Sequence, residues 1–464
     1  MLLAEARPAH ARWSEANGEF LDFVARNPEC LRRESYAPLA QEPTLAMDSI
    51  QPWPLFVGAG QRRELAAVAL GMDRLMKLAI ELFLDNDPAR VVDFFRTPGL
   101  SEALVEIFLE EPDGVQSAPS RADYVETRDG LHCVEFNTGR CLGGLQSGAL
   151  GELYLKSAPT ARFLREGGRR ARPQPVLGAY FRHLVDDTVR LGAWNGGDFN
   201  VAMPIRPHEP SWIARHVEEA WTRELCAALE AHGPAAAGRV LLCAVDDIAP
   251  DGGGLAVRGR PVHAVVDRHD GGGDVSRLFR AFKLGRANLF GGPVGALLGD
   301  KRNLALLSQN AGSDLLTAAE RAFLERHLPW TRRVLPARTA FRGSPLRIPE
   351  DLPGRREELV LKKGASLGGQ FVEVGRFHTA DGWNEAVRRA VGEEDWVVQE
   401  YLEPVSYVFQ GRQGGAVRHE VVWALFAFGE HFGGVFLRMQ PAGNGGVVNG
   451  CRGAEISTML EIVE

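Results

Sequence analysis

Four residues near position 130 carry side chains that could hold a cation beside a charged substrate: Arg121, Asp123, Glu135 and Asn137. The members of each pair are two positions apart, so on a β-strand they share one face. Two carboxylates and an amide oxygen are hard ligands of the kind that suits Mg²⁺ bridging the phosphates of a nucleotide. The guanidinium can neutralise a further anion. The structural alternative is that these are polar residues on the solvated face of a strand.

The sequence between the two pairs predicts the hairpin that would bring them together. Asp129-Gly130 is a strong signal for a two-residue turn, and residues 122–127 and 131–136 on either side are predicted strands. If the hairpin closes at this turn, all four side chains can converge in one pocket.

A second candidate site lies in residues 359–374, where the pattern predicts a strand, a glycine-rich turn and another strand. Lys362 and Lys363 end the first strand, and either ammonium can face phosphate oxygens. Glycines in the turn can present backbone N–H groups to the same oxygens. Those glycines are Gly364, Gly368 and Gly369. The spacing is not of the Walker type, because no Gly-Lys-Ser/Thr opens a helix here.

Two more strand ends complete the set of candidates. Residues 395–404 form an apolar strand that ends in polar residues, and Gln399, Glu400 and Leu402 are expected to contact the base and ribose of a nucleotide. Arg438 ends another apolar strand. The structural alternatives are a solvated strand end for the first group and a surface ion pair for Arg438.

In this order the residues resemble the ATP-grasp ligases, specifically the circularly permuted branch that includes glutathionylspermidine synthase. The metal and transition-state motif of that family is Arg-x-Asp followed by Glu-x-Asn, which the stretch from Arg121 to Asn137 matches in type and spacing. The family's two phosphate-binding lysines match Lys301 and Lys362, and its Gly-Gly-x-x-Leu-Arg strand ends at Arg438. The resemblance covers residues 115–450, and the glycine-rich loop follows the metal-binding strands, which marks the permutation.

The resemblance implies an α/β fold, a permuted ATP-grasp of the glutathione synthetase type, and an enzyme that uses ATP and one or two Mg²⁺ ions. The expected reaction joins a carboxylate to an amine through an acyl phosphate and releases ADP. The metal would be bound by Asp123, Glu135 and Asn137, and the reacting groups would be stabilised by Arg121 and Arg438. Lysines 301 and 362, with the glycine loop as a lid, would bind the phosphates.

Three questions stay open at this point. A kinase-like phosphoryl transferase and a catalytically inactive ATP-binding scaffold protein are alternative functions. Lys362 is followed by Lys363 where the family has proline, so either lysine could face the phosphates. The stretch after Asn137 departs from the polyamine enzymes, so the identity of the small-molecule or peptide carboxylate and of the amine acceptor is open.

Composition agrees with a large globular enzyme. The chain has 464 residues, 45% hydrophobic and 24% charged, and a net charge of −7, which argues against a nucleic-acid partner. No apolar run reaches the length of a membrane span, and the first residues lack a signal-peptide pattern, so we expect no membrane association and a cytoplasmic location. The six cysteines show no CxxC spacing and are too sparse for a disulfide scaffold.

Three regions are predicted along the chain. Residues 1–114 are mainly helical, residues 115–342 hold the metal-binding strands and the central core, and residues 343–464 form the glycine-loop lid and nucleotide-binding part. Residues 343–357, rich in proline and charge, are the expected linker between the last two. A capping box at 317–320 opens a predicted helix that ends near residue 327.

Overall fold

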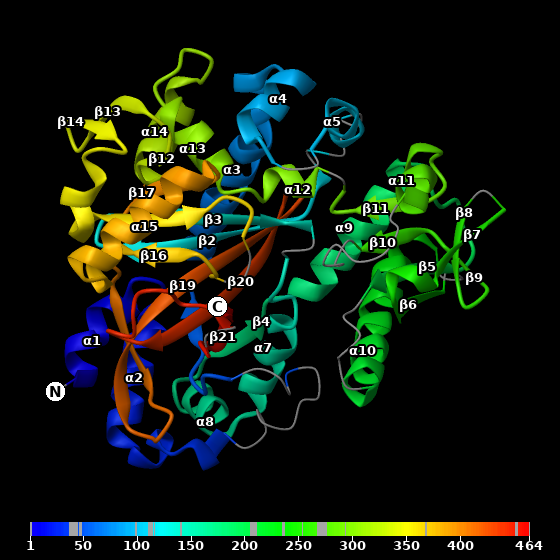
Figure 1. Ribbon diagram of the computed structural model, residues 1–464. Coiled ribbons are helices and arrows are strands. Elements are labelled where there is room, and N and C mark those ends of the chain that lie inside the picture. The colour runs from blue at the N-terminus through cyan, green and yellow to red at the C-terminus, as the bar shows by residue number, and fades with distance from the viewer. Residues whose placement is uncertain are drawn as a thin grey trace.

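The computed structural model describes most of the chain: residues 2–36, 45, 49–97, 100–109, 115, 117–139, 142–204, 211–233, 237–252, 254–266, 276–292, 294–366, 369–450 and 453–463. Helices and strands alternate in a mixed α/β arrangement built around three larger sheets (Figure 1). The expected α/β fold class is confirmed at this level.

The largest sheet runs through the centre of the molecule in the order β1-β21-β20-β19-β2-β3, with β18 and β4 attached at its margins. Its long strands are apolar on both faces, as expected of strands covered on both sides, and β20 is antiparallel to both of its neighbours. Their bounds are β1 Leu55–Val57, β2 Ser120–Thr127, β3 Gly130–Thr138, β4 Arg170–Pro173, β18 Ser406–Gln410, β19 Ala416–Phe428, β20 His431–Pro441 and β21 Glu455–Val463.

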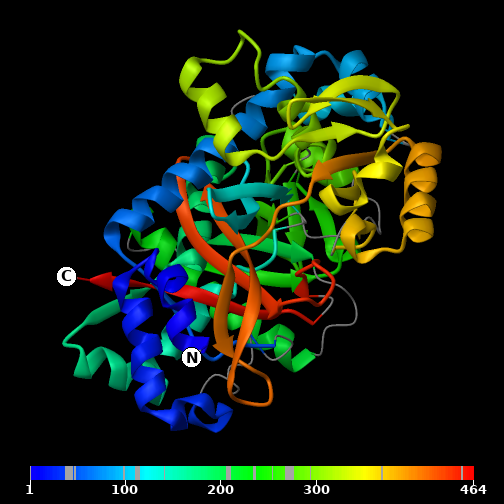
Figure 2. The same cartoon turned by 90° about the vertical axis from the view of Figure 1, so that its left-hand side faces the viewer.

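Helix α3 (Ala59–Leu84) packs against this sheet along β2, β19 and β20. Its buried residues recur at three- and four-residue steps, from Leu65 and Val68 to Ala79 and Ile80, so one stripe of the helix meets the sheet. The N-terminal helices α1 (Leu2–Ala11) and α2 (Glu15–Arg26) lie at the end of the sheet where β18 pairs with β19 (Figure 2). The described elements of residues 2–109 are helices apart from the short strand β1.

A smaller antiparallel sheet, in the order β12-β17-β15-β16, stands beside the hairpin β2-β3 (Figure 1). Helix α15 (Ala380–Glu393) covers it with Trp383, Ala386 and Val387, and the two elements share a hydrophobic core of their own. The strands are β12 Thr331–Arg333, β15 Leu359–Lys363, β16 Val372–Val374 and β17 Trp396–Glu400.

The predicted linker at 343–357 is wrong in part. Residues Ser344–Ile348 form strand β14, which pairs with β13 (Ala337–Phe341) in a hairpin, and a 3-10 helix follows at Leu352–Glu358. Leu346 and Ile348 are buried in the core of the small sheet. The alternation of polar and apolar residues therefore outweighs the prolines, which lie at a hairpin edge and before a helix.

A third, parallel sheet has the order β11-β10-β5-β6 and is flanked by helices α9, α10 and α11. Strands β5, β6, β10 and β11 are short and almost wholly buried. The bounds are β5 Phe199–Pro204, β6 Gly238–Cys243, β10 Ala264–Val266, β11 Asn288–Phe290, α9 Val176–Arg190, α10 Ser211–Leu229 and α11 Ser276–Lys283.

The remaining described elements connect these parts. The helices are α4 Pro88–Phe95, α5 Glu102–Leu109, α7 Ser147–Lys156, α8 Ala158–Glu166, α12 Gly295–Leu298, α13 Arg302–Gln309 and α14 Ala318–His327, and a meander is formed by β7 Ile248–Asp251, β8 Gly254–Val257 and β9 Arg260–Val262. The predicted capping box is present at the start of α14. No helix of the described residues is both long and apolar enough to cross a membrane. The division into three regions stays a prediction, and the central sheet takes strands from each of them.

Candidate functional site

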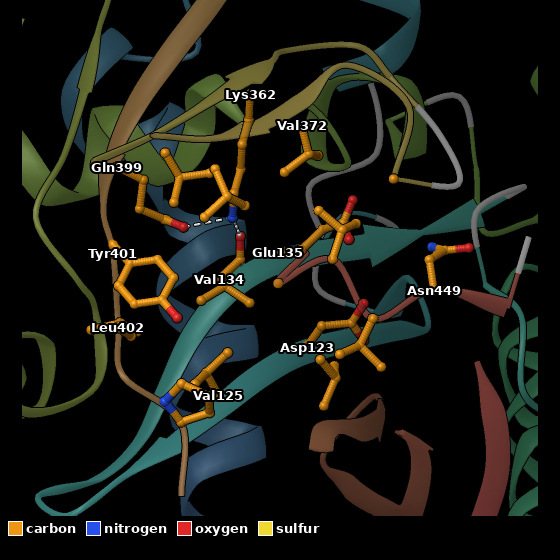
Figure 3. Close-up of a pocket in the computed structure, with 18 of the residues that line it drawn as sticks. Asp123, Val125, Val134, Glu135, Lys362, Val372, Gln399, Tyr401, Leu402 and Asn449 are labelled. Carbon is orange, nitrogen blue, oxygen red and sulfur yellow. Dashed lines mark hydrogen bonds between the residues drawn. The ribbon is translucent and has the colours of Figure 1, made fainter. Parts of the chain in front are cut away.

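A cavity of about 130 Å³ lies between the hairpin β2-β3 of the central sheet and the strands β15, β16 and β17 of the small sheet (Figure 3). One wall is acidic and the other carries a lysine, and apolar valines line the space between them. Its lining includes Asp123, Val125, Val134 and Glu135 from the hairpin, Lys301, and Val360, Lys362, Val372, Val374 and Gln399 from the small sheet. The segments 400–404 and 446–449 and the end of β20 close the sides.

The hairpin brings the four predicted side chains together through a pairing that differs from the expected one. Thr127 pairs with Gly130, so the turn residues are 128 and 129 and not Asp129 and Gly130. A β-bulge at Val134 then shifts the register, so that Asp123 lies opposite Glu135. A regular hairpin closing at the expected turn would have paired Glu135 with Tyr124 and turned its carboxylate to the other face. The extra residue of the bulge restores the shared face.

Asp123 is the centre of a buried cluster of donors. The Arg121 guanidinium donates to both of its oxygens, at 2.9 and 3.1 Å, and Asn137 Nδ2 donates to Oδ2 at 3.2 Å. Arg438 forms a further short ion pair with Oδ2. Burial raises the pKa of Asp123, but Arg121 and Arg438 outweigh it, and the pKa lies below its usual value. The carboxylate therefore stays ionised and holds two guanidinium groups. Asp123 and Arg438 line the cavity, whereas Arg121 and Asn137 lie behind them and are not among the lining residues.

Glu135 forms a second charged cluster with lysines from two other parts of the chain. Lys301 Nζ lies 3.0 Å from Glu135 Oε1 and also donates to the carbonyl of Ser366 at 2.7 Å. Burial raises the pKa of Glu135, but the lysines, Lys301 first, reverse this and lower it. The Glu135 side chain keeps 24% of its area exposed, and Figure 3 shows its carboxylate facing the cavity. One carboxylate thus neutralises cations that could otherwise face phosphate oxygens.

Lys362 lies in the wall opposite Glu135 and is buried. Its Nζ donates to the Val134 carbonyl at 2.8 Å and to Gln399 Oε1 at 2.6 Å. Burial lowers the pKa of Lys362 to about 8, against the attraction of Glu135. Lys363 points elsewhere, because it pairs with Glu393 at 2.7 Å on the outer side and is partly exposed. Of the two lysines that the sequence left open, Lys362 is therefore the one in the cavity.

The base of the glycine loop is fixed by close packing. The Lys301 backbone N–H donates to the Gly364 carbonyl at 3.2 Å, and the Gly364 N–H donates to the backbone carbonyl of Asp395 at 2.7 Å. A Cβ on Gly364 would lie 2.7 Å from Arg302 Nε, so glycine is required there by contact. Gly369 has a φ of 70° and lines the cavity, whereas Gly368 lies outside the described residues. Of the loop glycines in the described residues, Gly369 thus lies at the cavity and Gly364 lies at the packed base of the loop.

The remaining predicted residues also line the cavity, with differing exposure. Glu400 and Leu402 both face it, and Glu400 pairs with the exposed Arg342 at 2.8 Å. Gln399 is buried, and both ends of its amide are hydrogen-bonded.

Sequence reasoning missed the contribution of Val447 and Asn449, which lie against Gly369 and line the cavity. The signal available was the glycine cluster at 443–446, which the sequence could not assign to a site or a plain turn. It also missed the Val134 carbonyl, since no sequence pattern marks the bulge.

The oxygen ligands of this site suit a Mg²⁺ ion, and Glu135 is more available to it than Asp123. No group of three or more His, Cys, Asp or Glu side chains among the described residues is placed to hold a metal. Mg²⁺ bound to nucleotides needs only one or two carboxylates, the other ligands being phosphates and water. Glu135 faces the cavity and fits this role, whereas the Asp123 oxygens accept from Arg121, Asn137 and Arg438 and would have to exchange a partner.

One buried donor of the Asp123 cluster lacks an acceptor in the described part of the chain. Arg438 is buried and its Nε has no hydrogen-bond partner among the described residues. An unsatisfied donor of a charged group is costly in the interior. Arg438 lines the cavity beside Asp123, but its Nε atom is itself covered by protein, so an anionic group could reach it only after the side chain moves.

Comparison with solved structures identifies the fold. A glutathione synthetase-like effector from Globodera pallida matches with a TM-score of 0.52 and 13% sequence identity, over 89% of this chain and 90% of the effector. The likeness is one of fold. A protein assigned as a gamma-glutamylcysteine synthetase from Methylobacillus flagellatus matches with a TM-score of 0.38 and 12% identity, over 84% of this chain and 88% of that one. This TM-score is too low to support an argument about the fold. No protein-family model and no curated protein matches the chain.

Proposed function

We propose that this protein is an ATP-dependent carboxylate–amine ligase that forms an amide bond and releases ADP and phosphate. The observation that carries the proposal is the cluster in which Lys301 and Lys362, from two separate segments, flank the single carboxylate of Glu135 across a cleft between two sheets. A polyanion with a bound cation can replace this carboxylate as the partner of the lysines. The glutathione synthetase-like fold supports the same class of reaction.

The order of the motifs supports a circularly permuted ATP-grasp arrangement. The strands β2 and β3 precede Lys301, the glycine loop and β17 in the chain, although all of them meet at one cavity. A permuted order of the family's parts would leave the same walls in place with different connections.

The residues of the site suit the chemistry of carboxylate activation. A carboxylate is a poor acyl donor, and transfer of the γ-phosphoryl group of ATP to it gives an acyl phosphate that an amine can attack. Catalysis of phosphoryl transfer rests on positioning and charge neutralisation, which Lys301 and Lys362 would provide at the phosphates. Mg²⁺, when bound by Glu135 with Asn137 and Asp123, would supply further neutralisation of the phosphate charge.

The two arginines that pair with Asp123 would act on the second substrate. Arg121 and Arg438 lie side by side on Asp123, and their guanidinium groups can stabilise the reacting carboxylate and then the oxyanion of the tetrahedral intermediate. Closure of the glycine loop would keep water from the acyl phosphate. The carboxylate is expected to be a small molecule or a peptide, and the acceptor an amine.

The proposal is tested in two steps with the purified protein. Thermal unfolding with ATP and Mg²⁺, with ATP and EDTA, and without nucleotide measures binding; no shift in any arm would refute an ATP site. Phosphate release is then followed with a library of acids and amines, and products are analysed by mass spectrometry. An amide together with ADP supports the ligase, a stable phosphorylated acid with no amide indicates a kinase-like transferase, and binding without turnover of any acid indicates an ATP-binding scaffold.

A further inference from the structure

Two oxygens, one from each wall of the cavity, direct the ammonium group of Lys362. The Val134 carbonyl accepts at 2.8 Å from the central-sheet side, and Gln399 Oε1 accepts at 2.6 Å from the small sheet (Figure 3). An ammonium has three N–H donors, so two are committed and the third remains for the cavity. The direction of that third donor is set by the positions of the two acceptors.

The first acceptor exists because of the β-bulge. Val134 is the extra residue of strand β3 and has no paired residue on β2. Its carbonyl is therefore not used by the strand ladder and can accept from Lys362. The same bulge that turns Glu135 into the cavity thus supplies a hydrogen bond across it.

The second acceptor, Gln399 Oε1, is fixed by a series of hydrogen bonds in which each donor and acceptor role follows from the one before. The Thr331 hydroxyl donates to the Pro329 carbonyl at 2.9 Å, so its oxygen is an acceptor on its other side. Gln399 Nε2 donates to that oxygen at 3.0 Å. This arrangement leaves Gln399 Oε1 to face Lys362, and a reversed amide would place two donors against each other. Thr331 and Gln399 are paired residues on neighbouring strands, which keeps the chain in register.

We propose that Gln399 is a positioning residue that aims Lys362 at a phosphate group, and that it does not read the nucleotide base. The phosphate part of this inference rests on the proposed function. Both ends of the Gln399 amide are already used within the protein, so it has little left to offer a base. Its oxygen also favours the charged form of Lys362, in a setting where burial disfavours that form.

Other charged and titratable groups act on Lys362 besides Gln399. Glu135 attracts the ammonium and Lys301 repels it, while Asp123 and Cys133 act more weakly. Burial has the largest effect and brings the pKa of Lys362 to about 8. Among the contacts that influence the pKa of Lys362, the hydrogen bond to Gln399 can be removed by substitution without changing the charge of any side chain.

The test compares Gln399→Met, which keeps the size of the side chain, with the wild type over a pH series. ATP binding to the wild type should weaken as the pH rises through 8, because Lys362 loses its proton. Loss of the acceptor should lower the pKa of Lys362 and move this fall to lower pH. If the pKa falls by one unit, we expect affinity for ATP within about threefold of wild type at pH 6.5 and about fivefold weaker at pH 8, because the charged fraction of Lys362 at pH 8 falls from about one half to about one tenth. Gln399→Glu, which keeps an acceptor, should move the fall to higher pH.

A ligand-free measurement separates this inference from the proposed function. The folded pKa of Lys362, about 8, lies below the usual value for lysine, so its charged form is disfavoured in the folded state and stability rises with pH above 8. The stability deficit of Gln399→Met should be largest near pH 7 and shrink towards pH 10. Gln410→Met, another buried glutamine that bonds the Cys30 carbonyl, should show a deficit that does not change between pH 7 and 10.

The outcomes are distinct. A deficit of Gln399→Met that does not vary with pH, or a changed preference for ATP over GTP with no movement of the pH profile, would overturn the positioning role. Absence of ATP binding by the wild type at every pH would remove the proposed function, while the ligand-free pH series would still decide whether Gln399 controls Lys362.

Discussion

The substitution Glu135→Gln tests the charge balance of the site most directly. It keeps the shape of the side chain and removes the carboxylate that lies 3.0 Å from Lys301 Nζ. Lys301 is only 3% exposed, so the variant leaves a buried ammonium without its anion. Removal of one partner from a buried ion pair costs about 3–5 kcal/mol, and the glutamine oxygen can still accept a hydrogen bond. We therefore expect the ligand-free protein to lose about 2–4 kcal/mol at neutral pH.

The loss should depend on pH in a direction fixed by the pKa of Glu135. That pKa is lowered in the folded protein. A lowered carboxyl pKa contributes stability that is fully present above the unfolded value, about 4.3, and is lost as the pH falls through the folded value. The gap between wild type and Glu135→Gln should be full at pH 7, begin to shrink at about pH 4.3, and continue to shrink as the pH falls through the lowered folded value. Chemical denaturation across this range measures it.

Bound nucleotide should offset the loss of stability in Glu135→Gln. Phosphate oxygens can take the place of the lost carboxylate beside Lys301 and Lys362, so ATP with EDTA should bind Glu135→Gln at least as tightly as wild type. Ligand at one hundred times its Kd stabilises by about 2.7 kcal/mol, which is enough to offset most of the deficit. The further gain that Mg²⁺ gives the wild type should be absent in the variant, together with turnover.

Glu400→Gln is the matched control, because Glu400 lines the same cavity but pairs with the exposed Arg342. It should cost less than about 1 kcal/mol, as exposed ion pairs do, and keep the response to Mg²⁺. Equal losses in the two variants, or an unchanged Mg²⁺ increment in Glu135→Gln, would refute the assignment of Glu135 as the anion that balances the lysines and binds the metal.

Three further outcomes follow from the geometry. Lys363→Ala should leave the Kd for ATP within about twofold of wild type, measured by calorimetry, because its ammonium pairs on the outer side; a large loss would mean that the glycine loop shifts its register when nucleotide binds. Gly364→Ala should lower the melting temperature and weaken ATP binding, since a Cβ would lie 2.7 Å from Arg302 Nε, and unchanged values of both would show that the loop base can yield. Arg438→Lys should reduce kcat about tenfold or more with little change in the Kd for ATP, because lysine cannot keep the contact to Asp123 and also present a second donor; a change in ATP affinity alone would place Arg438 at the phosphates instead.

Residue types and local spacing were enough to predict much of the candidate site. The pairs Arg121 with Asp123 and Glu135 with Asn137 share strand faces as the two-residue period requires. The strand at 359–363 and the capping box of α14 also follow from local pattern. These features depend on neighbours within a few residues, so the sequence alone determines them.

Tertiary structure decided what depends on contacts between distant segments. The bulge at Val134 sets the face of Glu135, and it is stabilised by Lys362, which lies far along the chain on another sheet. The choice between Lys362 and Lys363 was likewise open until strand β15 had a defined inner and outer side. A shift of one residue reverses the face of a strand at almost no change in local pattern, so only packing against the opposite wall selects the register.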